Sequence, residues 1–240
     1  EINLGDLGQY KVVFIDKHDV DLDVPEDTLP QVFRILEEQL SVASGLLGDI
    51  ETSYFHTPTC YPGREVAGGD RITEAAEVVT WFVQLFDRVA AKWPEQANAH
   101  ATLWPAADRF FFRKLKLYAF SKVDAFEADH VAKAVLSLDQ DTFWDNYVIR
   151  ELLFLLVDRW KEFSQENRNQ LTDRILTGPD QLSHWPDDEF PGLRDAFAVR
   201  YARYLELQGC ELTADRSERL ANMTKGILEW NDVSATSMVI

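Results

Sequence analysis

Residues 143–160, FWDNYVIRELLFLLVDRW, are the most apolar stretch of the chain and constrain its fold most strongly. On a helix, successive side chains are about 100° apart, which places the apolar ones on roughly half of the circumference and the charged ones opposite. A bilayer span needs roughly 20 apolar residues free of such charges, so the stretch predicts a helix of a packed core. Phe154, Leu155 and Tyr147 fall outside the main stripe, which predicts burial on more than one side. The stripe comprises Val148, Ile149, Leu152, Leu153, Leu156, Val157 and Trp160, and the charged side Arg150, Glu151, Asp158, Lys161 and Glu162.

Helix start and stop signals recur along the chain from about residue 28 onwards. The first predicted helix, 28–48, has Thr28 as its N-cap and Pro30 in its first turn. The second, 72–93, ends before Pro94, where a proline would stop further winding. The inner stripe of the first helix is predicted to be Val32, Leu36, Leu40 and Val42, and later helices are predicted over 105–122, 124–138, 143–160, 164–179, 190–209 and 212–230.

The six later helices group into three successive pairs, each a long apolar helix followed by a shorter polar one. Their anchors LKLYAF, LLFLLV and ARYLEL recur at a loose spacing of roughly 40 to 50 residues, which is typical of divergent helical repeats. The predicted fold is therefore all-α, with antiparallel hairpins stacked as an irregular HEAT-like solenoid; a compact helical bundle is the alternative. One short strand is predicted over 9–16. We expect an extended acidic segment over 1–27 and a helical-repeat domain over 28–240, with an irregular loop at about 51–72.

Charge and cysteine content exclude several classes of function. The formal net charge of −17 repels polyanions, so general nucleic-acid binding is disfavoured. Two cysteines, Cys60 and Cys210, provide neither a disulfide framework nor a Cys-rich metal module. The sequence also lacks the established phosphate-loop, nucleophile-elbow and zinc-protease motifs. We therefore expect no cofactor, a cytoplasmic location and, because the chain begins at Glu1 without Met, a piece excised from a longer polypeptide.

Two segments carry groups that could bind a ligand. Residues 18–27, HDVDLDVPED, concentrate carboxylates, but the segment lacks the glycine and the final glutamate of a calcium loop. His56 and Cys60 could supply half of a zinc site, and no second pair is present. The simpler interpretation of both segments is a solvated entrance to a helix and a plain loop. A small ligand-binding or enzymatic helical domain that uses the loop from His56 to Asp70 remains the alternative function.

The only basic island of the chain lies in RFFFRKLKLYAFSK, residues 109–122. Three consecutive phenylalanines point in three directions around a helix, so they do not form one stacking surface for bases. Phe111, Leu115, Tyr118 and Ala119 are predicted to be core residues instead. The basic side chains are then either a polar face paired with acids or a surface that contacts a phosphate or a protein. The candidate interaction residues are Arg109, Arg113, Lys114 and Lys116, with Lys122 at the end of the island.

Residues 115–213 resemble the helical-repeat region of large bacterial anti-phage defence proteins. The resemblance rests on LYAF at 117–120, FWD at 143–145, the pattern L-x-x-R-I-L-x-G-P at 171–179 and RYARYLELQG at 200–209. These are helix ends and core positions, with no catalytic signature among them. In that family, such regions are joined to sirtuin-like NAD-consuming effectors or to NTPase modules, whose nucleotide-binding motifs do not occur in this chain.

The resemblance implies a sensor, scaffold or assembly role without catalysis. We expect a curved helical surface that recognises a phage protein or controls the effector domain of the same polypeptide. The expected partner is thus a protein, with neither nucleic acid nor a membrane involved, and self-association into an oligomer is compatible with this role.

Overall fold

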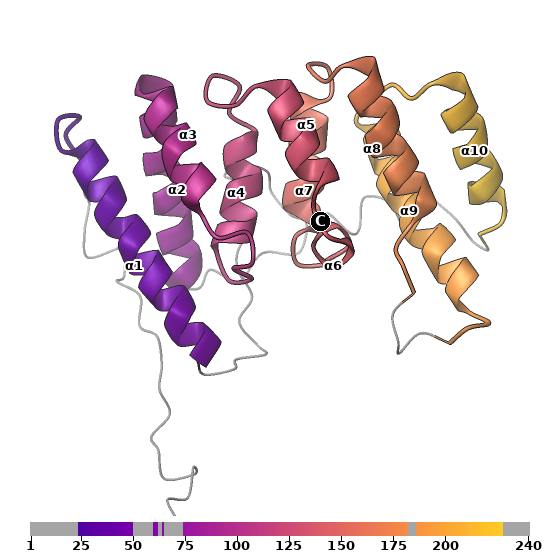
Figure 1. Ribbon diagram of the computed structural model, residues 1–240, viewed down its shortest axis with the longest axis horizontal. Helices are drawn as coiled ribbons and strands as arrows, with labels where there is room; N and C mark the ends of the chain where they lie inside the picture. Colours follow the sequence, from indigo (N-terminus) through magenta and orange to yellow (C-terminus); the bar gives the residue numbers. More distant parts are fainter. Residues whose placement is uncertain (1–23, 50–59, 62–63, 65–73, 182–185, 228–240) are drawn as a thin grey trace, which may run out of the picture. The chain divides into compact units, whose positions relative to one another are not determined.

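The computed structural model describes residues 24–49, 60–61, 64, 74–181 and 186–227, and it confirms the all-α class. These residues form ten α-helices and no strand (Figure 1). The strand predicted over 9–16 and most of the acidic segment over 1–27 lie outside the described residues. The helices are α1 Leu29–Asp49, α2 Glu74–Lys92, α3 Pro94–Leu103, α4 Phe112–Phe120, α5 Ala128–Leu136, α6 Gln140–Phe143, α7 Ile149–Arg159, α8 Gln165–Thr177, α9 Phe190–Leu207 and α10 Ala214–Lys225.

The chain divides into two compact units, and the division falls within α4. The first unit consists of Glu1–Pro62 and Gly69–Leu115, and the second of Gly63–Gly68 and Lys116–Ile240. The residues that the sequence groups into a single helical-repeat domain are thus distributed over two separately packed bodies.

An aromatic core holds α1, α2 and α3 together in the first unit. The rings of Phe33 and Phe82 stack with centroids 4.9 Å apart, and Trp104 packs against Phe86 at 5.3 Å and against Phe112 at 5.8 Å. Aromatic pairs at such distances add about 0.5–1.5 kcal/mol each beyond the area that they bury. These contacts between α1, α2 and the residues that follow α3 set the rotation of each helix about its axis.

The predicted inner stripe of α1 is partly wrong, because the core contacts rotate the helix. Leu40 is buried as predicted, whereas Val42 is 57% exposed and Val32 and Leu36 are only half-buried. The phase is set by Phe33, which is fully buried against Phe82 and Phe86. The residues of α1 that pack inward are Leu29, Phe33, Leu40, Ala43 and Leu47.

Two helix boundaries differ from the prediction in the first unit. Helix α3 was not predicted; Pro94 ends α2, as expected, and also occupies the first position of α3, where its missing N–H costs nothing. The helix predicted from residue 105 begins only at Phe112. Asp108 explains the later start, because its Oδ1 accepts from the backbone N–H groups of Phe110, Phe111 and Phe112 at 2.7–3.1 Å. Its other oxygen accepts from the Ser44 hydroxyl of α1.

The second unit contains two rows of helices. Helix α5 contacts α8, and α8 contacts α10, so these three follow one another in one row; α7 contacts α9 in the other (Figure 1). Contacts of α9 with both α8 and α10 join the rows. The residue types at these helix boundaries account for them: Ser164 caps the start of α8, its Oγ accepting from the Asn167 N–H at 3.2 Å. Gly178 and Gly209, which follow α8 and α9, both have positive φ.

The stretch 143–160 forms a shorter helix than predicted, buried on more than one side as predicted. It begins with the end of α6 and a turn, and α7 starts only at Ile149. Leu152, Phe154 and Leu155 are all buried, whereas Tyr147, in the turn before α7, is 58% exposed, contrary to the prediction. The assignment of Glu151 to an exposed charged face is wrong, because that side chain is fully buried. The helical pattern indicates through Phe154 and Leu155 that a second element covers α7, but it does not show that this element also covers Glu151.

Phe111, Leu115, Tyr118 and Ala119 are buried, as the sequence predicts. Phe110, in the turn after Asp108, and Phe112, the first residue of α4, are buried as well. Within the described ranges, no helix has both the length and the apolar content to cross a membrane.

We predict that Leu152→Asp unfolds or aggregates the protein. Leu152 is 1% exposed, and an unpaired buried charge costs several kcal/mol against a total stability of roughly 5–15 kcal/mol. Leu207→Asp is the matched control, because the same replacement at a side chain that is 43% exposed should cost less than about 1 kcal/mol. Circular dichroism during urea titration measures both. Cooperative unfolding of Leu152→Asp at the wild-type midpoint would contradict the assignment of α7 to the core.

Candidate functional site

The predicted basic residues around α4 do not share one exposed surface. Arg109 is exposed, with its guanidinium 5.0 Å from the Phe110 ring centroid. Arg113 is half-buried, and its Nε donates to the Ala106 carbonyl at 3.4 Å. Lys114 is buried at 9% exposure. Lys116 belongs to the second unit and is half-buried, and this burial lowers its pKa. Arg109 is thus the most accessible of the four for a partner.

The predicted ligand-binding segments are described only in part. Of the acidic segment, Glu26 is exposed and forms an ion pair with Lys92, whose hydrogen bond lowers the pKa of this carboxyl. Cys60 is buried, while His56 and Asp70 lie outside the described residues. Within the part of the chain that is described, no three His, Cys, Asp or Glu side chains are arranged to hold a metal ion.

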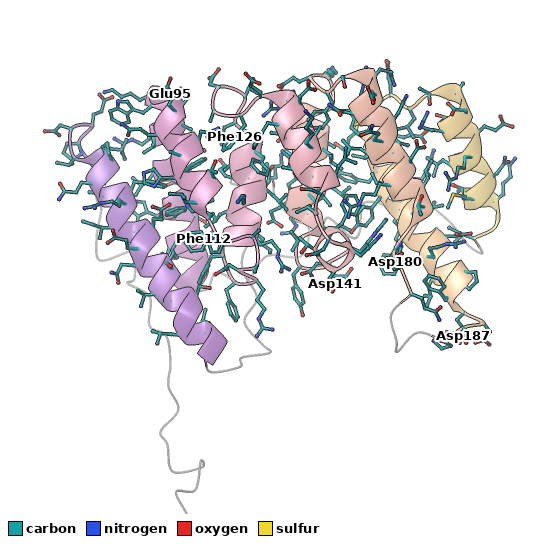
Figure 2. The ribbon with its side chains drawn as sticks, viewed as in Figure 1. Glu95, Phe112, Phe126, Asp141, Asp180 and Asp187 are labelled. Carbon is teal, nitrogen blue, oxygen red and sulfur yellow. The ribbon has the colours of Figure 1, made fainter. Side chains whose placement is uncertain are left out.

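Arginine side chains of the second unit close the carbonyl ends of neighbouring helices. Arg159, at the end of α7, is 1% exposed and donates to the Phe120 carbonyl at 2.7 Å and to the Phe126 carbonyl at 2.8 Å. Its Nε lies 2.9 Å from Glu162, which balances the buried charge. The last carbonyls of α4 have no partner within their own helix, so a guanidinium with several donors in one plane suits them well. Figure 2 labels Phe126 in the turn after α4.

The same kind of contact joins α5, α8 and α10 one after another. Arg174 of α8 donates to the Val135, Leu136 and Leu138 carbonyls at the end of α5, at 2.6–3.1 Å. Arg219 of α10 donates to the Leu176 carbonyl near the end of α8 at 2.9 Å. In both cases the donor comes from the next helix of the same row.

Pairs of side chains link these helices as well. Asn167 of α8 donates to Asp129 of α5 at 2.7 Å, and Arg216 of α10 forms a bidentate pair with Asp173 of α8 at 2.6 and 2.9 Å. Asn167 and Asp129 both lie near the starts of their helices, while Arg174, near the end of α8, contacts the end of α5. Along α10, the contact on α8 advances from Asp173 to Leu176 as the donor advances from Arg216 to Arg219. Helices α5, α8 and α10 consequently run parallel.

A further site in the second unit surrounds Arg64, which lies in no helix. Its guanidinium lies 4.4 Å from the ring centroid of Phe154 on α7 and forms an ion pair with Asp158, one turn further along that helix. The side chains of Arg64 and Asp158 are 35% and 27% exposed, so the pair is accessible to solvent. Phe154 is buried.

Tyr204 of α9 lies near this site, since both of its charged groups act on the phenol. Burial raises the pKa of its phenol to about 12; the positive charge of Arg64 lowers this pKa and the negative charge of Asp158 raises it. Tyr204 is therefore neutral at physiological pH and lies within electrostatic range of both charged groups. Burial also raises the pKa of the Cys210 thiol to about 12, which disfavours its thiolate form at physiological pH.

Sequence reasoning missed the Arg64 site. Arg64 stands alone in the loop segment PGREV, 94 residues from Asp158, and no local periodicity connects the two. The one available signal was the apolar Phe154 outside the main stripe of α7, which predicted that something covers that side. Nothing in the sequence indicated that an arginine from the loop does so.

Comparison with known proteins gives no relative: no family model, no curated protein and no solved structure matches this chain.

We predict that Arg174→Ala lowers the free energy of unfolding by about 2–4 kcal/mol, because it leaves several carbonyls at the end of α5 without their charged donor. Arg174→Lys should lie in between, since an ammonium lacks the planar fork. Lys133→Ala, which removes an exposed positive charge in the last turn of α5, is the control and should change stability by less than about 1 kcal/mol. Urea denaturation compares the three, and equal stability of Arg174→Ala and wild type would refute the role of Arg174.

Proposed function

We propose that this chain is a non-catalytic helical-repeat region of a bacterial anti-phage defence protein, in which it serves as a sensor or scaffold. Its hairpins are proposed to stack as an irregular HEAT-like solenoid. The observation that carries the proposal is the recurring contact from one helix to the next in the row α5, α8, α10, at separations of 36–43 residues. In a stacked array each repeat contacts chiefly its neighbours, so similar contacts are expected between each pair of successive helices in a row.

The proposed partner is a protein, either a phage component or the effector domain of the same polypeptide. The net charge of −17 supports a protein over a nucleic acid, because a polyanion would be repelled. Exposed carboxylates contribute to this field, and Figure 2 shows Asp141, Asp180 and Asp187 along one edge of the second unit. Among the basic residues, Arg109 is the proposed contact, with Arg113 beside it. The proposed location is the cytoplasm.

Co-expression with individual phage structural proteins, followed by affinity capture of this chain, tests the proposal. We expect one of them, or the effector domain, to be captured by the wild type and released by Arg109→Glu, with Lys133→Glu as a charge-matched exposed control. Capture must also fail with Leu152→Asp, because a partner that binds the unfolded chain does not recognise a folded surface. In the polypeptide that carries this region, deleting it should abolish defence or effector control. Full defence and normal effector control after deletion would refute the proposal.

A further inference from the structure

The surface around Arg64 has the composition of an arginine-binding site. Phe154 offers a ring face to the planar guanidinium at 4.4 Å, and Asp158 accepts from its N–H groups one helical turn away. Ring stacking and a carboxylate at the edge of the plane suit a guanidinium and not an ammonium, which has neither a flat face nor a fixed fork. Tyr204 of α9 is buried and neutral, and it lies within electrostatic range of both charged groups. The site is therefore selective in its chemistry.

The contact is also weak enough to exchange. Both charged side chains are partly exposed, and an ion pair of that kind, together with a cation–π contact, changes an equilibrium by roughly tenfold. Arg64 and Asp158 are 94 residues apart in sequence, so their contact is not a consequence of the spacing of side chains within one helix. Arg64 competes for this site mainly through its high local concentration, because it belongs to the same chain.

We propose that the surface formed by Phe154, Asp158 and Tyr204 is a guanidinium-binding subsite for an arginine-bearing segment of a protein partner. Arg64 occupies the subsite in cis and leaves when the partner's arginine enters. The inference rests on the proposed function, since it names the chemistry by which the helical scaffold recognises its partner. Because Arg64 belongs to the same chain, a partner's arginine must displace it in order to bind. Arg64 therefore raises the partner concentration needed for binding, and it favours partners that present several arginines or are held close by.

A synthetic peptide with the sequence of residues 61–68, YPGREVAG, carrying a fluorophore, tests the proposal against the full chain. We expect Arg64→Ala to bind this peptide about tenfold more tightly than the wild type, because the subsite is then open in every molecule. A peptide with lysine in place of arginine should bind Arg64→Ala roughly tenfold more weakly. Adding Asp158→Asn to Arg64→Ala, a change of charge with little change of shape, should remove the preference for arginine. Fluorescence anisotropy at low ionic strength measures these affinities.

Arg34→Ala is the matched control, because Arg34 is an exposed arginine paired with Glu38 on α1, in the other unit. It should leave the affinity for the peptide unchanged. Equal binding by Arg64→Ala and the wild type, or equal binding of the arginine and lysine peptides, would overturn the proposal. Phe154→Leu keeps the site apolar without the ring face, and it should likewise remove the preference for arginine. Failure of these measurements rejects the subsite alone, whereas failed partner capture rejects the proposed function.

Discussion

The second unit depends on closing the carbonyl ends of its helices. The last four carbonyls of every helix have no partner within it, and burying such groups without one costs free energy comparable to a lost hydrogen bond. Arg159, Arg174 and Arg219 each solve this problem for a helix other than their own. Each arginine reaches these carbonyls only if its own helix lies at a fixed position beside them. The hydrogen bonds that provide partners for the carbonyls therefore also fix which helices are neighbours and in which direction they run.

Helix periodicity and capping chemistry predicted the class of the fold and most helices, because both signals are local. Ser164 and Gly178 bound α8 as their residue types indicate. The errors have non-local causes. Asp108 delays the start of α4 and accepts a hydrogen bond from Ser44 of α1. Glu151 is buried although it lies on the charged side of the predicted helix. Neither outcome can be read from a window of the sequence, since both depend on an element elsewhere in the chain.

The candidate sites were harder to predict than the helices. The sequence places several basic residues close together and so suggests one basic surface, but Arg109 is exposed whereas Lys114 is buried. The guanidinium subsite depends on a loop residue that contacts α7, far from it in sequence. The only sequence signal for it was Phe154 outside the apolar stripe of α7, which indicated a covering element. The net negative charge of the chain and the proposed subsite have complementary roles. The charge attracts cationic segments of a partner, and the subsite distinguishes arginine from lysine within them.

The central proposal is that the helices of the second unit form a stacked array, stabilised by contacts from each helix to the next. Ending the chain at Thr213, which removes α10, tests this claim most directly by hydrogen exchange and urea denaturation. Stacked repeats predict that α5, α7, α8 and α9 stay helical and protected, with a lower but still cooperative unfolding midpoint, as Arg219 and Leu220 are lost from the end of a row. Loss of protection in α5, which α10 does not extensively contact, together with non-cooperative unfolding, would contradict it.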